Sequence, residues 1–342
     1  MPMIDWVTAV IPCTHKDLIV GGSILCFDRD GNEEWSTEKA LSVVGSFDNR
    51  IQIKTHQQSF ETGKPSHLWI SGNPVKFLQG HNIFGSCDLV YLMSKLVDAM
   101  ILKGNLGICP TDFELALIRQ GKYVVTRVDV NQSYHLANHV QVLSWIKAAA
   151  NSSRLRYRGR GQFSGDTLYH GKSSRRWALK CYSKYLEIMA KGHKLPPELL
   201  IPQLLDWADK SLRIEAVIRS MELKRRGLDF ASAWTPEAAK LLLQELIGHL
   251  EMTDSFILPD EVVESLPTKL KPVYSLWISG HDMHTQYSRP TFYRHRAALL
   301  KYGIDIAITQ ESLKSNVVPL IQILRAVPAE IPDWAYELKL VV

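Results

Sequence analysis

Three acidic side chains, Asp5, Asp129 and Glu215, fall inside stretches that have the composition of β-strands. A carboxylate inside a buried strand costs free energy unless it is paired with a cation or ligates a metal ion. For one such residue an internal salt bridge is the ordinary explanation, and for Asp129 the partner would be Arg127 or Arg213. Three of them together favour a metal-dependent site that acts on phosphodiesters.

His81 is a fourth candidate ligand. It follows a glycine-containing turn and precedes a helical stretch, so its ring could reach over the edge of a sheet. Oxygen donors suit Mg²⁺ or Mn²⁺ better than zinc, and an imidazole shifts the preference toward Mn²⁺. We therefore expect one Mg²⁺ or Mn²⁺ ion. A subset of His81, Asp5, Asp129 and Glu215 would hold it, and Asp129 would belong to that subset.

Two tyrosines, Tyr182 and Tyr185, stand beside Lys184 at the end of a basic segment. Residues 154–184 contain nine basic residues and one acid, whereas the whole chain has a net charge of +5. Such a segment indicates a polyanionic partner, although a solvated loop explains a charge run equally well. The residues of this segment that we expect to contact DNA are Arg154, Arg156, Arg158, Arg160, Lys172, Arg175 and Arg176.

Two suggestive spacings carry no function. Residues 171–173, Gly-Lys-Ser, look like the end of a phosphate-binding loop, but the glycine required earlier in that loop is replaced by Asp166. We therefore infer that the chain is not an ATPase. His135 and His139 have the i, i+4 spacing of a helical zinc pair, but Leu136 stands where the glutamate base belongs. An ordinary pair of histidines explains that spacing better.

The composition is that of a globular protein. Of the 342 residues, 46% are hydrophobic and 22% are charged, which allows a sizeable core and argues against disorder. The sequence lacks both a run of eighteen apolar residues and the features of a secretory signal, so we expect no membrane segment and a cytoplasmic location. The five cysteines form no C-x-x-C pair, so we expect neither a disulfide framework nor a structural zinc site.

The elements that must position these residues form an α+β pattern. Alternation or β-branched content predicts strands at 4–11, 67–71, 123–130, 167–169, 177–182 and 211–219. Apolar periodicity and start signals predict helices at 88–104, 111–119, 196–210 and 235–249. The sheet would therefore carry the three acids and Tyr182.

A stretch with three prolines and several acids, 254–272, suggests a domain boundary. We predict a first domain at 1–253 and a smaller, mainly helical domain at 254–342. In the second, Ser288 and Gly303 predict the start and the end of one helix. Its N-terminal half carries Arg289 and Arg294, as a DNA-recognition helix would, although an amphipathic packing helix explains the same pattern.

Several longer motifs resemble those of one family. They are residues 3–5, 74–85 with the core Gln-Gly-His-Asn, Arg127-x-Asp129, Tyr182-x-Lys184, Arg213-x-Glu215-Ala216, 316–320 and 332–334. Over nearly its whole length the chain resembles the gene II replication initiators of filamentous phages, the nickases that start rolling-circle replication. The Gln-Gly-His-Asn block and the Asn-Val-Val-Pro-Leu block at 316–320 are the most specific of these motifs.

The resemblance implies an antiparallel-sheet nicking domain over 1–253, related to the HUH-type replication endonucleases. It implies that Tyr182 attacks one strand of the origin, leaves a 5′-phosphotyrosine and a free 3′-hydroxyl, and later rejoins the strand. Lys184 would help to activate the hydroxyl group, and Tyr185 would be a helper or merely structural. The His–hydrophobe–His metal motif of that superfamily has no clean copy in this sequence.

The resemblance also implies partners. Since the chain has no ATPase loop, it would need a host helicase and a DNA polymerase, in addition to double- and single-stranded origin DNA in the bacterial cytoplasm. A non-enzymatic origin-binding protein, with Tyr182 as a core aromatic, is the alternative. A tyrosine recombinase would need a His-x-x-Arg motif, which His295 does not begin.

Overall fold

The computed structural model describes residues 2–59, 63–155, 159–190, 195–252, 263–264, 266–300, 302, 304, 306–307 and 327–342. The motif at 316–320 lies outside the described residues, as do Arg156, Arg158 and Gly303. The side chains of Arg154 and Arg160 are also outside that description.

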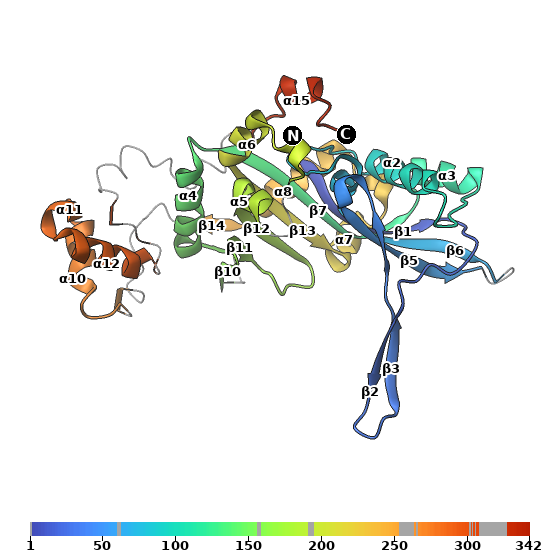
Figure 1. The fold of residues 1–342 in the computed structure, drawn as a ribbon, viewed down its shortest axis with the longest axis horizontal. Helices are drawn as coiled ribbons and strands as arrows, with labels where there is room; N and C mark the ends of the chain where they lie inside the picture. The colour runs from blue at the N-terminus through green and yellow to red at the C-terminus, as the bar shows by residue number, and fades with distance from the viewer. Residues whose placement is uncertain are drawn as a thin grey trace.

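A nine-stranded sheet forms the centre of the molecule (Figure 1). Its strand order is β10 (Gln162–Ser164), β11 (Thr167–His170), β12 (Trp177–Ser183), β13 (Ser211–Arg219), β7 (Val124–His135), β1 (Met3–Pro12), β6 (Pro65–Gly72), β5 (Arg50–Gln58), β4 (Leu41–Val44). Every neighbouring pair is antiparallel. The predicted antiparallel α+β fold is therefore confirmed.

Helices flank the sheet. They are α1 (Pro74–Gln79), α2 (Leu89–Leu102), α3 (Asp112–Arg119), α4 (His139–Ser152), α5 (Lys184–Met189), α6 (Pro202–Asp209), α7 (Ser220–Arg226) and α8 (Pro236–Gly248). Predicted N-caps are in place: Asp88 accepts a hydrogen bond from the Tyr91 amide, and Thr111 forms a capping box with Glu114. The predicted helix 196–210 is instead a 3₁₀ turn followed by α6, because a proline at 202 disfavours helical geometry in the residue before it.

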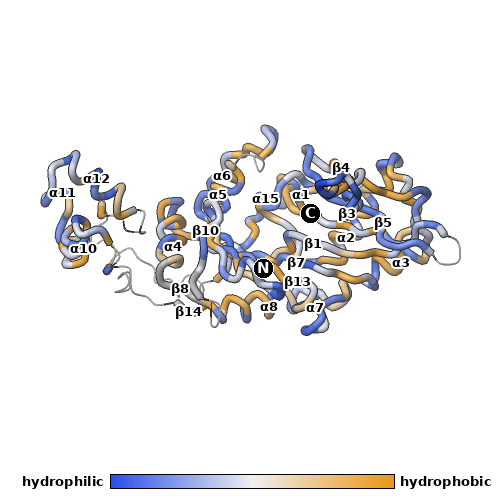
Figure 2. Tube along the Cα trace, turned by 90° about the horizontal axis from the view of Figure 1, so that it is seen from below, coloured by the Kyte–Doolittle hydropathy of each residue, from blue (hydrophilic) through white to orange (hydrophobic). Residues whose placement is uncertain are grey.

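The two faces of the sheet differ in chemistry because side chains alternate along a strand. On β13, Leu212, Ile214 and Ala216 point into the main apolar core, which also contains side chains of α2, α4 and α8. Apolar stretches of α2 and α8 are visible in Figure 2. Ser211, Arg213, Glu215 and Val217 of β13 are buried outside that core. The strand is thus buried on both faces, and its polar face carries charge.

The C-terminal part contributes two separate clusters. Helices α10 (Lys271–Ile278), α11 (Met283–Gln286) and α12 (Arg289–Leu300) share their own apolar cluster. The last helix, α15 (Asp333–Glu337), belongs to a cluster that contains Phe84 and Trp207 of the first part of the chain. The amide of Ala329 also donates a hydrogen bond to the Ser133 carbonyl, at 2.8 Å. The domain boundary at residue 253 stays a prediction. The last residues of the chain pack against the part that precedes this boundary.

A two-stranded hairpin extends away from the sheet (Figure 1). It consists of β2 (Ser23–Phe27) and β3 (Glu33–Glu38), and four large apolar side chains on it are exposed: Ile24, Leu25, Phe27 and Trp35. Residues 23–38 contain five acids and one arginine. Backbone hydrogen bonds from Gly21 to Lys39 at 2.6 Å, and from Lys39 to Gly22 at 2.8 Å, close its base.

One carboxylate, Glu222 at the start of α7, binds three arginines. Arg176, Arg225 and Arg226 donate to it at 2.8, 2.5 and 2.7 Å. Burial alone would raise the pKa of the Glu222 carboxyl, but the hydrogen bonds from these arginines outweigh it and lower the pKa to about 2. This cluster also shows that Arg176, one of the predicted DNA contacts, has an internal partner.

The Glu222 cluster predicts a pH dependence of stability. Since the folded-state pKa is depressed, the stabilisation is present above the unfolded pKa near 4.5 and is lost as the pH falls toward 2. We expect Glu222→Gln to lower the free energy of unfolding by about 3 kcal/mol at pH 7 and to flatten that acid dependence. Urea unfolding between pH 7 and pH 2.5 measures both. An Asp206→Asn control, at an exposed ion pair with Lys210, should change little.

Candidate active site

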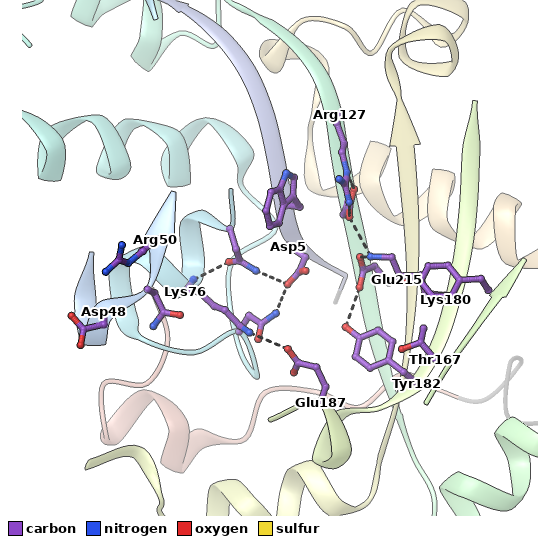
Figure 3. A pocket seen from close by; sticks show the side chains of 16 residues that line it. Asp5, Asp48, Arg50, Lys76, Arg127, Thr167, Lys180, Tyr182, Glu187 and Glu215 are labelled. Atoms are coloured by element: carbon purple, nitrogen blue, oxygen red, sulfur yellow. Dashed lines mark hydrogen bonds and ion pairs between the residues drawn. The ribbon is translucent and has the colours of Figure 1, made fainter. Parts of the chain in front are cut away.

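The polar face of the central strands forms a cavity of about 570 Å³. Asp5, Asp129, Tyr182 and Glu215 line it, together with Lys180 (Figure 3). The structure therefore brings together all three acids that the sequence analysis selected and the predicted nucleophile. They come from four strands, β1, β7, β12 and β13, that are neighbours in the sheet.

The register of the strands explains why these side chains meet. Lys180 of β12 lies opposite Glu215 of β13, and Tyr182 lies opposite Arg213. Asp129 of β7 lies opposite Val217, the second residue after Glu215. Residues two apart on a strand share a face, and residues opposite each other are neighbours on that face.

A β-bulge brings β1 into the same cavity. Ile4 pairs with Val130 and Val7 pairs with Val128, so one extra residue of β1 is accommodated between them. A bulge redirects side chains that strict alternation would send to opposite faces. Both Asp5 and the adjacent Trp6 line the cavity as a result.

Tyr182 donates a hydrogen bond from its hydroxyl group to Glu215 Oε2 at 3.0 Å. Burial, reinforced by the negative charge of Glu215, raises the pKa of the phenol well above its usual value. Burial also raises the pKa of the Glu215 carboxyl, although Lys180 opposes that shift. The phenol is therefore protonated at neutral pH, and a carboxylate stands within reach of its proton.

Two cations neutralise the acids of this cavity. Lys180 Nζ lies 2.5 Å from Glu215 Oε1 and 3.6 Å from Asp129 Oδ2. Arg127 donates to both oxygens of Asp129, at 2.8 and 2.6 Å, and its guanidinium lies over the ring of Trp6. Asp129 thus has the internal arginine partner that the sequence analysis considered as one alternative.

Lys184 lies in a second network behind the cavity. Its Nζ donates to Asn82 Oδ1 at 2.7 Å and to Glu187 Oε2 at 2.5 Å. The Asn82 amide in turn donates to Asp5 Oδ1 at 2.6 Å, and Asn73 donates to the same oxygen at 2.9 Å. Burial lowers the pKa of the Lys184 ammonium to about 7. Its hydrogen bonds therefore lead to Asp5, whereas the hydroxyl of Tyr182 is bonded to Glu215.

His81 and Tyr185 do not line the cavity. The imidazole Nδ1 of His81 accepts a hydrogen bond from the Ile83 amide at 3.2 Å, and its Nε2 has no hydrogen-bond partner among the described residues. Burial and the nearby cations Lys184, Arg213 and Lys76 lower the pKa of the imidazole to about 3. The ring of Tyr185 packs edge-on against His139, 5.2 Å between centroids.

Arg213 holds the Gln-Gly-His-Asn loop in place, a role that the sequence analysis did not assign to it when it considered Arg213 as a partner of Asp129. It is fully buried, and it donates to the carbonyls of Asn82 and Ile83 at 2.5 and 2.6 Å and to Ser133 Oγ at 3.1 Å. Asn82, Asn73 and Lys180 are site residues that sequence reasoning missed. The available signal was the alternation of β12 and β13, which puts Lys180 and Arg213 on the face that carries Tyr182 and Glu215.

The cavity contains the type of ligand atom that a hard divalent cation prefers. Asp5, Asp129 and Glu215 supply carboxylate oxygens, the ligands that Mg²⁺ and Mn²⁺ prefer. Among the described residues, however, no three His, Cys, Asp or Glu side chains are grouped closely enough to hold a metal ion. Each acid is instead bonded to a protein cation or an amide. His81, surrounded by three cations, is the weakest of the predicted ligands.

The predicted DNA contacts that the structure describes lie on the surface. Lys172 and Arg175 lie on the loop between β11 and β12. Lys172 donates a hydrogen bond to Ser164 Oγ at 2.9 Å. Arg289 and Arg294 are exposed on α12. Apart from Arg176, whose partner is Glu222, none of these has an ion-pair partner among the described residues.

The protein is thus an antiparallel-sheet protein of the α+β class, whose sheet buries a tyrosine against a carboxylate between charged neighbours. Residues 3–237 match the family described as "Replication-associated protein G2P N-terminal", and residues 258–341 match "Replication-associated protein G2P C-terminal". The chain belongs to the replication-associated protein G2P family of filamentous phages. The resemblance inferred from the motifs is thereby confirmed.

Two relatives illustrate how far the similarity extends. The chain is 40% identical over 334 residues to the replication-associated protein G2P of Enterobacteria phage I2-2, covering 97% of this chain and 96% of the relative. It is 24% identical over 326 residues to the protein of the same name from Enterobacteria phage M13, covering 78% and 77%. Within the described part of the chain, no helix combines the length and the apolar content needed to cross a membrane.

Proposed function

We propose that this protein starts rolling-circle replication by nicking one strand of a phage origin with Tyr182. The observation that carries the proposal is the hydrogen bond from the Tyr182 hydroxyl to Glu215 in a cavity lined by cations. It pairs a nucleophile with a base, as covalent catalysis requires. The shared name of the relatives, replication-associated protein, agrees with a role at an origin.

The reaction balances with the groups present. Glu215 takes the phenolic proton, and the oxygen of Tyr182 forms a bond to phosphorus while the bond from phosphorus to the 3′ oxygen breaks. The leaving 3′ oxygen takes a proton from Lys180, whose ammonium becomes a stronger acid once the protonation of Glu215 removes one of its two carboxylate partners. The products are a 5′-phosphotyrosine and a free 3′-hydroxyl. The reverse steps rejoin the strand without ATP, because the ester retains the energy of the bond.

Charge development at the phosphate is met by the cations of the cavity. Arg127 and Lys180 line the same cavity as the reacting tyrosine, and both are oriented by Asp129. A Mg²⁺ or Mn²⁺ ion would add neutralising charge at the same place. The carboxylates of Asp5, Asp129 and Glu215 are the donors available to it, although among the described residues they are not grouped as a three-ligand site. Lys184, through Asn82, positions Asp5 in this arrangement.

The proposed function also assigns roles to the basic segment, to host proteins and to the two predicted domains. The arginines of the segment 154–176, together with Lys172, would bind the phosphates of origin DNA. Such contacts position the protein without specifying sequence. A host helicase would unwind from the nick, and a DNA polymerase would extend the 3′-hydroxyl in the cytoplasm of the bacterial host. The predicted domains, 1–253 for nicking and joining and 254–342 for recognition, assign these tasks to the two parts of the chain.

A covalent-adduct assay tests the proposal. The full chain is incubated with a single-stranded origin oligonucleotide in Mg²⁺ or Mn²⁺, with the label placed in turn on each side of the nick. We expect labelled protein with a 5′-phosphotyrosine link and release of a fragment with a 3′-hydroxyl. Tight origin binding without any adduct would favour the non-enzymatic origin-binding protein. A 3′ link would favour a tyrosine recombinase.

Helix α12 provides a prediction on origin selection. We expect Arg289→Gln with Arg294→Gln to reduce the preference for duplex origin over unrelated duplex by at least about thirtyfold, because each of the two base contacts is worth about 1–3 kcal/mol. Cleavage of a single-stranded oligonucleotide should not change. Competition binding measures the preference, and a variant with Lys269→Gln and Lys271→Gln is the matched control. Removing the whole C-terminal part would be less informative, since α15 packs with Phe84.

A further inference from the structure

The end of the cavity away from Tyr182 is formed by the turn between β4 and β5. Asp48, Asn49 and Arg50 line the cavity there, and Figure 3 shows Asp48 and Arg50 across it from Tyr182. None of them takes part in the proton transfers or in the attack proposed above. These three residues of the cavity lining therefore have no role in the proposed reaction.

The turn has an unfavourable backbone. Phe47 and Asp48 are consecutive non-glycine residues with φ of 49° and 58°, in the left-handed region. L-residues with a large side chain rarely adopt that conformation, and they do so when the surroundings enforce it. Ser46 Oγ donates to the Leu78 carbonyl at 2.8 Å, and Asn49 Nδ2 donates to the carbonyls of Ser46 and Gly80, both at 3.1 Å. These bonds hold the turn against the Gln-Gly-His-Asn loop.

The enforced turn exposes an aromatic ring on the residue that directly precedes Asp48 of the cavity lining. Phe47 is 47% exposed although it is a large apolar side chain. One edge of its ring lies against Gly80, where a Cβ atom would come within 2.3 Å of the ring. A side chain at position 80 would displace the ring, so this glycine leaves room for it. The hydrogen bonds of this turn therefore stabilise a strained backbone that keeps the ring of Phe47 exposed to solvent.

A cation, Arg50, follows Phe47 by three residues at the end of the same turn and lines the cavity. Arg50, the first residue of β5, is exposed and has no carboxylate within ion-pair distance among the described residues. It differs in this from Arg127, whose guanidinium is bound by Asp129. Arg50 is therefore available to a phosphate. The carboxylate of Asp48 disfavours a second phosphate at the same place and suits an amino group of a base.

We propose that Phe47 and Arg50 form a subsite for one unpaired nucleotide of the origin strand, next to the scissile phosphate. The base stacks on the ring of Phe47, and Arg50 binds its phosphate. This inference rests on the proposed function for the identity of the strand. Stacking needs a free face of the base, so the subsite selects single-stranded DNA over duplex.

The test uses the full chain without divalent ions, so that DNA stays uncleaved. Single-stranded oligonucleotides of the viral origin carry 2-aminopurine at successive positions around the nick. We expect quenching of its fluorescence on binding at one position. Phe47→Ala should remove that quenching and weaken single-strand binding about tenfold, as loss of base stacking does. Phe47→Tyr should retain both properties, and duplex binding should not change. Phe113→Ala, an exposed phenylalanine on α3, is the matched control.

Two further variants separate this subsite from a structural role. Arg50→Gln should reduce the dependence of log Kd on log salt for single strands by about 0.7, the value for one phosphate contact. Arg29→Gln, on the acidic hairpin, should leave it unchanged. Phe47→Gly, which removes the strain, should bind single strands as weakly as Phe47→Ala while melting at the same or a higher temperature.

The outcomes distinguish the two proposals. Unchanged single-strand binding by Phe47→Ala, or an equal loss for single and double strands, would overturn the subsite even if wild-type protein forms covalent adducts. A lower melting temperature of Phe47→Gly together with a general loss of binding would show that the ring is structural. Conversely, Phe47-dependent quenching without any covalent adduct would retain the subsite and reject the nicking reaction.

Discussion

Replacing Tyr182 by phenylalanine should abolish covalent attachment to origin DNA, with a loss of at least about 10⁴-fold in nicking rate. The change removes one oxygen, the atom that would bond to phosphorus and that now donates to Glu215. Affinity for duplex origin should stay within about twofold of wild type, since phosphate contacts carry much of that binding. Gel separation of labelled adducts measures the first effect, and equilibrium binding measures the second.

Tyr185→Phe is the matched control for that experiment. Tyr185 is three residues away, and its ring packs on His139 outside the cavity lining. We expect this variant to nick at a rate close to that of wild type. If Tyr185→Phe lost the adduct and Tyr182→Phe kept it, the assignment of the nucleophile would be reversed.

Replacing Asp129 by asparagine should have the second largest effect. The variant keeps the shape but leaves Arg127 without its buried carboxylate and Lys180 with one acid fewer. Breaking a buried ion pair costs about 3–5 kcal/mol, and we expect a decrease of that size in the free energy of unfolding. Nicking should also fall strongly. If Asp129 helps to hold a divalent ion, raised Mn²⁺ should partly restore it.

Urea unfolding and nicking at several Mn²⁺ concentrations separate these contributions. Asp98→Asn, at an exposed pair with Arg119 in which the atoms are 3.8 Å apart, should alter neither property. A destabilised Asp129→Asn protein that still nicked at the normal rate in ordinary Mg²⁺ would remove Asp129 from the catalytic arrangement and leave it a structural ion pair.

The sequence is sufficient to group Asp129, Tyr182 and Glu215, because strand alternation is a local property. Once β7, β12 and β13 are recognised as strands, the face on which each residue lies follows from its position along the strand, because successive side chains point to opposite faces. The same rule would have selected Lys180 and Arg213. Helix α4 is harder to predict, since its apolar positions include Val140, Val142 and Ile146, which are β-branched and favour strands.

Other parts of the site depend on contacts between distant segments. The bulge that turns Asp5 and Trp6 into the cavity arises from the register between β1 and β7, which the sequence of β1 alone does not encode. His81 looks like a ligand in the sequence because of its flanking glycines. Its surroundings are set by Arg213, more than a hundred residues away, which binds the backbone of the same loop. Asn82, the next residue, is the one whose side chain contacts Asp5.

The hairpin formed by β2 and β3 begins and ends at a single point of the fold, because Gly21 and Lys39 are hydrogen-bonded across its base. Its length can therefore change during evolution without moving any strand of the nine-stranded sheet. A short turn from Gly22 to Lys39 should fold as well as the natural sequence. Related phages could thus exchange this acidic, apolar hairpin as an independent module while the cavity of the central sheet stays fixed.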